Sequence, residues 1–173
     1  MKNKKWILIL FTAYTVCMSL SCKKDKLTKE TQTGANTFSC KIDGVVFKPS
    51  ESAGLFGSPP ITVYNLPNNG FTLLGKYYGD RSDPTSKYIS LNLEYLKSTG
   101  IYNLNFYPNQ GLYVISYSGG PAYQTDGTHT GTVTITRCDT VNKIYSGTFS
   151  FTAIDKNTGN VVKVTDGRFD VKQ

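Results

Sequence analysis

His129 is the only histidine of the chain, so it is the first residue to test for acid–base chemistry. A hydrolase triad needs a serine within hydrogen-bond reach of the imidazole and a carboxylate behind it. Asp126 and several serines are present, but the sequence has no G-x-S-x-G segment that would expose a nucleophile on a sharp turn. One histidine also cannot supply a His-rich zinc site. We therefore predict a solvated loop histidine, no catalytic residue, no metal site and no cofactor.

A calcium loop could begin at Asp155, because Asp155, Asn157 and Asp166 would offer oxygen ligands. The fifth and sixth positions of this stretch are Gly159 and Asn160, whereas a helix-flanked calcium loop needs a ligand followed by glycine. The flanking residues also have the pattern of strands. A hairpin turn explains the same residues, and we predict a turn here.

Cys40 and Cys138 are the two cysteines of the globular part, and an extracytoplasmic compartment would permit a disulfide between them. Cys40 is in phase with the apolar residues of its strand, whereas Cys138 is out of phase with Val133 and Ile135. A bulge near Arg137 would restore the match. A disulfide and two reduced, partly buried thiols both stay open at this point.

Three tyrosines beside the long loop 119–130 are candidate ligand-binding residues, namely Tyr113, Tyr117 and Tyr123. Exposed aromatic faces stack on sugars and on partner surfaces. The alternative is that strands favour tyrosine in any case, with the ring half buried and the hydroxyl in water.

Residues 1–22 have the pattern of a secretory signal peptide, with an early run of lysines and an apolar stretch over 6–18. That stretch is too short for a comfortable membrane span. Small residues precede Cys22 and a polar run follows it, which resembles a bacterial lipoprotein signal. The resemblance implies cleavage before Cys22 and acylation of that cysteine, although Ser19 stands where the pattern prefers leucine. A plain signal peptide and an uncleaved anchor helix are the alternatives.

Residues 1–21 are thus the expected lipoprotein signal peptide. The rest of the chain divides into a tether, residues 22–36, and a single domain, residues 37–173. The tether has one large apolar residue, Leu27, and no periodicity, so we expect it to be flexible. Several of the lysines behind the net charge of +7 lie in the signal segment, and the remaining basic residues are scattered. Nucleic acid is therefore not an expected partner. The membrane is the expected partner through the lipid anchor, and a glycan or an envelope protein is a further candidate.

The stretch 131–171 determines the predicted architecture, because apolar residues alternate there with threonine and serine. Val133, Ile135, Phe149 and Phe151 each stand between polar neighbours, and this period of two is the signal of a strand. Other strands are expected at 37–42, 45–48, 61–66, 71–78, 87–96, 101–107 and 112–118. About ten strands and no helix beyond the signal peptide predict an all-β fold, an antiparallel β-sandwich or barrel-like sandwich.

Details of the last strands follow from the same alternation. Asp166 and Gly167 should break the strand or form a bulge in it. Phe169 and Val171 should then close the core, while the charged residues between and beside them face water. Those charged residues are Arg168, Asp170 and Lys172.

The run SGTFSFTAIDKNTGNVVKVTDGRFDVK at 146–172, with TITRCD before it and TFSCKIDGVVFKPS near the start, resembles a family of secreted Bacteroidota lipoproteins. That family is a domain of unknown function. The resemblance covers the whole mature domain, is sharpest over 134–172 and is least visible over 50–130. It implies an all-β domain at the cell envelope and brings no catalytic residues.

These observations together predict a lipid-anchored protein of the bacterial cell envelope with a non-enzymatic binding or structural β domain. We expect an outer-membrane lipoprotein, and whether it faces the periplasm or the cell surface stays open. The alternative is a glycan-binding or glycan-processing accessory lipoprotein.

Overall fold

The computed structural model describes residues 26–51, 58–66, 70–79, 84–115 and 119–173. The predicted signal segment with Cys22, and Tyr117, lie outside these residues. The described residues form an 11-stranded antiparallel sheet and contain no helix, which confirms the predicted all-β fold. The strands are β1 (Thr37–Ile42), β2 (Val45–Phe47), β3 (Ile61–Leu66), β4 (Gly70–Tyr77), β5 (Lys87–Leu93), β6 (Gly100–Leu104), β7 (Gln110–Ile115), β8 (Ala122–Gln124), β9 (Gly131–Asp139), β10 (Ile144–Ile154) and β11 (Val161–Lys172).

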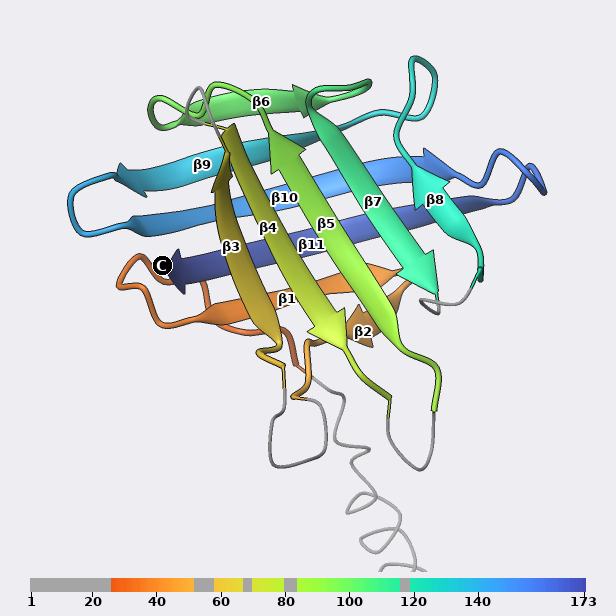
Figure 1. Ribbon diagram of the computed structural model, residues 1–173, viewed down its shortest axis with the longest axis horizontal. Helices are drawn as coiled ribbons and strands as arrows, with labels where there is room; N and C mark the ends of the chain where they lie inside the picture. The colour runs from red at the N-terminus through yellow and green to blue at the C-terminus, as the bar shows by residue number, and fades with distance from the viewer. Residues whose placement is uncertain (1–25, 52–57, 67–69, 80–83, 116–118) are drawn as a thin grey trace, which may run out of the picture.

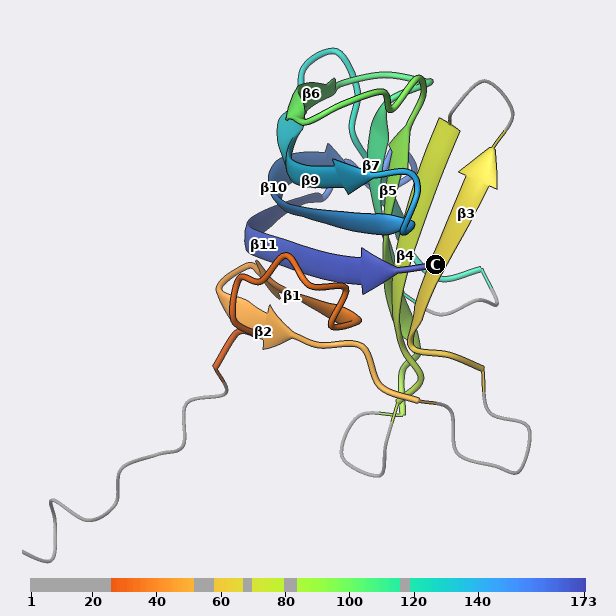
Figure 2. The ribbon, with the colours of Figure 1, turned by 90° about the vertical axis from the view of Figure 1, so that its left-hand side faces the viewer.

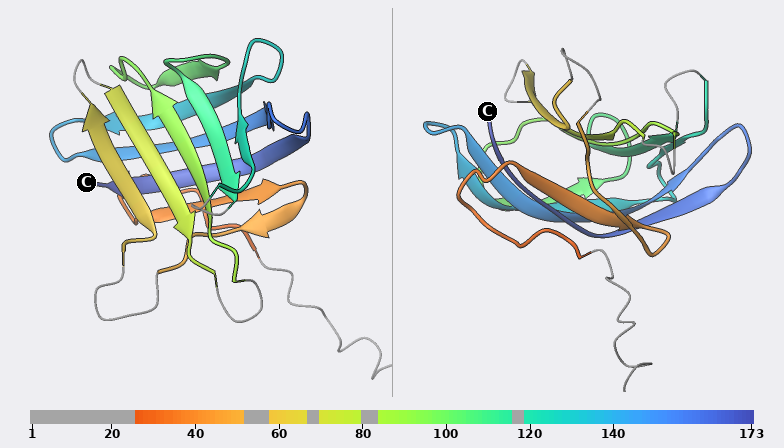
Figure 3. Two further views of the ribbon diagram at one scale, coloured as in Figure 1. Left: turned by 45° about the vertical axis from the view of Figure 1, so that its right-hand side comes forward. Right: turned by 90° about the horizontal axis from the view of Figure 1, so that it is seen from below.

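The strands form a single curled sheet in the order β2-β1-β11-β10-β8-β7-β5-β4-β3, and β9 and β6 extend it from β10. Most of β10 pairs with β9, but its last residue, Ile154, pairs with Gln124 of β8. This bridge turns the sheet back on itself. Figures 1 and 2 show two layers as a result, with β3, β4, β5 and β7 lying obliquely over β9, β10 and β11. From below, the layer of β9, β10 and β11 is bowed like part of a barrel wall (Figure 3).

The core lies between the two layers and is rich in aromatic rings. Phe38, Phe149, Phe151 and Phe169 of the β1–β11–β10 layer are each at most 4% exposed. Glycines in the opposite layer make room for two of them, because a Cβ added at Gly75 would lie 2.8 Å from the Phe38 ring. A Cβ added at Gly111 would lie 2.9 Å from the ring of Phe151. The missing side chains thus let the layers approach closely.

Bulges and turns appear where the sequence predicts them. Asp43 and Gly44 join β1 to β2, the strands predicted at 37–42 and 45–48, with φ values of 48° and 84° that suit a two-residue hairpin turn. The register of β9 against β10 shifts between Ser146 and Gly147. The register of β10 against β11 shifts between Phe149 and Phe151, next to Asp166 with its φ of 53°.

Several strand bounds differ from the predicted pattern, among them that of β6, which ends at Leu104 rather than at Tyr107. The loop predicted over 119–130 contains the short strand β8, whose three residues are too few to show an alternation. β5 ends at Leu93 rather than at Leu96, because Tyr95 has a φ of 59° and a strand cannot continue through that conformation. In the described residues we find no helix that is long and apolar enough to span a membrane.

Candidate functional site

Asp170 of β11 lies on the outer face of the sheet, yet only 1% of it is exposed. Its carboxylate accepts six hydrogen bonds, with donor–acceptor distances from 2.6 to 3.3 Å. The donors are the hydroxyls of Thr31, Thr33 and Ser146 and the backbone N–H groups of Thr33, Gly34 and Ala35. Five of these six bonds come from one short segment that precedes β1.

Burial alone would raise the pKa of the Asp170 carboxyl. The hydrogen bonds from Thr31, Ser146, Ala35 and Gly34 outweigh that effect and hold the pKa well below its usual range. No lysine or arginine of the described ranges forms an ion pair with this carboxylate. Neutral donors therefore stabilise its charge, as in the anion-binding concavities that backbone N–H groups form.

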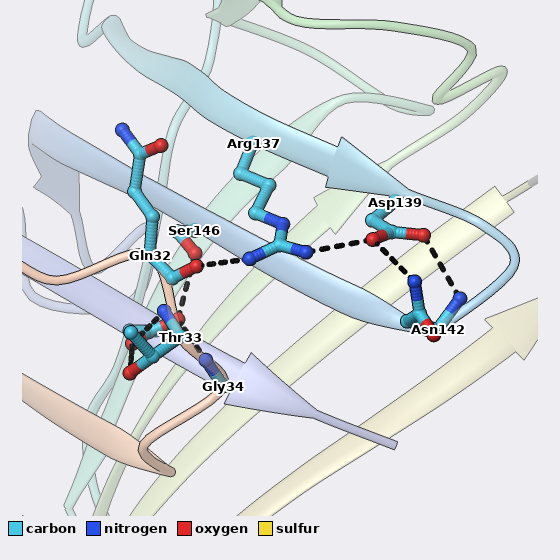
Figure 4. Close-up of polar contacts among 8 residues, drawn as sticks. Gln32, Thr33, Gly34, Arg137, Asp139, Asn142 and Ser146 are labelled. Carbon is cyan, nitrogen blue, oxygen red and sulfur yellow. Dashed lines mark hydrogen bonds and ion pairs between the residues drawn. The ribbon is translucent and has the colours of Figure 1, made fainter.

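Residues 27–36, here called the N-terminal strap, lie across the outer face of β1 and β11. Thr28 donates its backbone N–H to Ser39 Oγ at 3.0 Å, and its carbonyl accepts a hydrogen bond of 3.3 Å from Arg168. Farther along, Gln32 offers its carbonyl to the guanidinium of Arg137. Figure 4 shows that this guanidinium also reaches Asp139.

The strap changes two sequence-based interpretations. Residues 22–36 were expected to be a flexible tether, but the described part of this range is bound to the sheet. Asp170 was expected to face water, and that prediction is wrong because the strap covers it. The alternation correctly predicted the face on which Asp170 lies; it could not predict what covers that face.

A polar hollow of about 280 Å³ lies beside the strap on the outer face of β9, β10 and β11. Three threonines and one serine line it, and the charged residues Glu30, Asp166 and Arg168 also belong to its wall. The charged groups already have partners, because Arg168 lies 3.5 Å from Glu30 and Lys41 lies 2.9 Å from Asp166. The hollow has hydroxyls to offer and no open aromatic ring or free cation in its described wall.

A second, smaller pocket of about 120 Å³ lies at the ends of β4 and β5, where the β6–β7 turn meets them. It is lined by Thr72, Asn92, Leu93, Glu94, Tyr107 and Pro108. Tyr107 is 75% exposed, so its ring is open to solvent. The Glu94 backbone N–H donates to Asn109 Oδ1 at 2.7 Å, and this bond holds the β6–β7 turn against the end of β5.

The tyrosines predicted as ligand-binding residues lie elsewhere. Tyr113 and Tyr123 are 5% and 8% exposed, and their rings stack on each other with centroids 5.8 Å apart. Both rings face the core, so neither presents an open face in this structure. Tyr117 lies outside the described residues. Exposed tyrosines occur instead at positions that the strand pattern did not single out, namely Tyr64, Tyr95 and Tyr107.

The two cysteines of the domain are free thiols in this structure. The β9 bulge does bring Cys138 to the core face, opposite Tyr145, as the bulge hypothesis requires. Cys40 is nevertheless on β1, and β11 and β10 separate that strand from β9. Three strand spacings of about 4.8 Å exceed the reach of a disulfide. Burial raises the pKa of both thiols, and Asp139 adds to the effect at Cys138.

Asp126 and His129, the candidates for acid–base chemistry, form hydrogen bonds within a local turn. Asp126 Oδ1 accepts hydrogen bonds from the backbone of Thr128 and His129 and lies 3.1 Å from His129 Nδ1. These bonds, with the His129 backbone first, lower the pKa of Asp126. No serine or threonine hydroxyl of the described residues bonds to the imidazole.

The hairpin turn predicted at 155–160 is confirmed. Asp155 accepts hydrogen bonds of 3.0 Å from the Asn157 backbone N–H and 2.8 Å from the Thr158 hydroxyl. Across the described ranges, no cluster of three or more His, Cys, Asp or Glu side chains is arranged to hold a metal ion.

Residues 82–171 match a protein family described as a domain of unknown function, DUF6252. The chain belongs to this family. Neither the curated proteins nor the solved structures include a match to the chain.

The DUF6252 match begins near the start of β5 and ends at Val171, so it includes Asp170, Asn92 and Tyr107. It covers much of the middle region in which the sequence resemblance was least visible. The strap and β1 to β4 precede the matched segment. The surroundings of Asp170 and the pocket beside Tyr107 therefore both combine DUF6252 residues with residues from the N-terminal half of the domain.

Proposed function

We propose that this chain is a lipid-anchored protein of the bacterial cell envelope whose β domain binds its partner without catalysis. The observation that carries the proposal is the position of the N-terminal strap, which is bound to the sheet from residue 28 onward. Four residues lie between Cys22 and Leu27, and the five residue steps from one to the other span at most about 18 Å in an extended chain. Lipid chains on Cys22 therefore hold the domain close to the membrane surface.

The sequence supports the anchor through the signal pattern that ends at Cys22 and through the resemblance to secreted Bacteroidota lipoproteins. Bacterial lipoproteins carry more than one acyl chain, and more than one chain is needed for stable retention at a bilayer. The location that fits best is the outer membrane, facing either the periplasm or the cell surface.

Two aspartates, Asp139 and Asp166, support a role in binding rather than in catalysis. Asp139 accepts hydrogen bonds from Asn142 and Arg137, and both lower its pKa. Hydrogen bonding to Lys41 lowers the pKa of Asp166. Each of these groups is held ionised by its own neighbours, whereas a general acid needs a raised pKa near the working pH.

The anchor is tested by replacing Cys22 with serine and following the full-length chain in a Gram-negative host. Cys22→Ser should abolish labelling with a fatty-acid probe and should release the chain from the membrane fraction. Cys17→Ser is the matched control, because Cys17 lies inside the apolar stretch, and it should leave both unchanged. Labelling of Cys22→Ser at the level of the unaltered chain would show that the anchor is elsewhere.

A glycan is the second candidate class of partner, within the same envelope role. The open ring of Tyr107 beside a mainly apolar pocket that also carries the polar side chains of Thr72, Asn92 and Glu94 is the observation that favours it.

A further inference from the structure

We propose that the outer face of β3, β4 and β5 binds a neutral glycan chain, with Tyr107 as the ring on which a sugar stacks. This inference rests on the proposed binding role and gives it a ligand class and a site. β4 and β5 lie side by side in the layer nearest the viewer in Figure 1.

The site is built on one row of residues that crosses three strands. Tyr64 of β3 pairs with Thr72 of β4, and Thr72 pairs with Asn92 of β5. Their chain neighbours Leu73 and Leu91 are buried in the core, so the row points away from the core. Adjacent strands lie about 4.8 Å apart, which places Asn92 roughly 10 Å from Tyr64.

Aromatic rings stand at both ends of this row. Tyr107 borders the pocket next to Asn92 and Thr72, and it is 75% exposed. Tyr64 is 48% exposed at the other end. An exposed tyrosine face suits the C–H face of a pyranose ring, while its hydroxyl stays in water. One sugar unit at Tyr107 and a following unit toward Tyr64 would use the whole row, so the site fits a chain of sugars.

Polar groups with hydrogen-bonding capacity to spare lie between the rings. Asn92 Oδ1 accepts a bond of 3.1 Å from Ser90 Oγ, which directs the amide nitrogen of Asn92 to an outside acceptor. Thr72 offers a hydroxyl. The carboxylate of Glu94 has no cationic partner in the described part of the chain, so it can accept hydrogen bonds from sugar hydroxyls.

The charge of the lining selects among glycans. It includes one carboxylate, Glu94, and no lysine or arginine. A glycan that carries uronic acid or phosphate groups would meet repulsion there without a compensating cation. The arrangement therefore favours neutral hexose or pentose chains over acidic ones.

The experiment is isothermal titration of the full-length chain in detergent micelles. The neutral probes are cellohexaose, maltohexaose, xylohexaose and mannohexaose, and hexagalacturonate is the acidic comparison. We expect at least one neutral probe to bind and hexagalacturonate not to bind. Tyr107→Ala should weaken binding about tenfold or more, because stacking and area burial are both lost. Asn92→Ala should weaken it about fivefold.

Tyr95→Ala is the matched control, since Tyr95 is 52% exposed but does not line the pocket. It should leave affinity unchanged, and equal thermal midpoints should show that every variant is folded. Equal loss in Tyr95→Ala and Tyr107→Ala, or tighter binding of hexagalacturonate, would overturn the site. The absence of binding to every neutral probe would overturn the ligand class, whereas the Cys22→Ser fractionation tests the anchor independently.

Discussion

Asp170 is the residue whose surroundings are most demanding, since its buried carboxylate accepts six hydrogen bonds without a cation. Asp170→Asn places an NH2 group where one oxygen stood, so at least two donors would face another donor in either orientation. We expect the free energy of unfolding to fall by about 3 kcal/mol. Denaturant midpoints of the mature chain carrying Cys22→Ser would measure it. Asp166→Asn, at an exposed pair with Lys41, should leave it nearly unchanged.

The Asp170 carboxylate also predicts how the difference in free energy of unfolding between the parent chain and Asp170→Asn depends on pH. The pKa of Asp170 is lower in the folded chain than its usual value of about 3.9, so its ionisation favours the folded state. This contribution is complete above pH 4 or so and is lost as the pH falls toward the folded pKa. The free energies of unfolding of Asp170→Asn and of the parent chain, plotted against pH, should therefore converge below pH 4. A constant difference down to pH 2 would contradict the assignment.

At the residue scale, the alternation of polar and apolar residues predicts the face of the sheet to which a side chain points. It does not predict which other segment packs over that side chain. Asp170 points outward as predicted, but five of its six hydrogen bonds come from a strap with no apolar periodicity. The tyrosines show the same limit. Tyr113 and Tyr107 have the same chemistry, and only the pairing of β7 with β5 and β8 places the former in the core.

Strand β10 shows at the scale of an element what the core depends on. Phe149 and Phe151 are 4% and 3% exposed, and they stack with centroids 6.4 Å apart. We expect Phe151→Ala to cost about 3–5 kcal/mol, because a buried ring is lost and a cavity replaces it. Thr152→Ala is the control, since that side chain is on the other face and its backbone bond to Thr130 stays. Equal shifts of the thermal midpoint for Phe151→Ala and Thr152→Ala would mean that the Phe151 ring contributes no more to stability than an outward-facing side chain.

Strand boundaries were predictable where a turn residue marks them. β1 and β3 have the predicted bounds, because Asp43 and Gly44 end one and prolines flank the other. β8 was missed because three residues show no period. The bulge that turns Cys138 inward was only one of two open readings of the sequence. A bulge shifts the phase by one residue, and a single chain does not reveal that shift until its partner strand is known.

At the scale of the whole molecule, the sheet is a half-barrel with its core inside and the strap outside. The class of fold followed from strand count and turn spacing, but the curl depends on one bridge between β10 and β8, which no local pattern encodes. The candidate glycan site likewise depends on how strands pair and not on a local sequence pattern. Tyr64, Thr72 and Asn92 stand on three successive strands, and the register of β3, β4 and β5 aligns them in one row.

The strap should therefore behave as part of the folded domain. A chain that begins at Lys26 should melt like the mature chain, and one that begins at Asn36 should lose about 3 kcal/mol, or roughly 6–12 °C in Tm. Five of the six hydrogen bonds to Asp170 disappear in the shorter chain. Asp170→Asn should then have a much smaller effect there, because both changes remove the same interaction. Additive effects of truncation and Asp170→Asn would show that the strap and this carboxylate stabilise the domain independently.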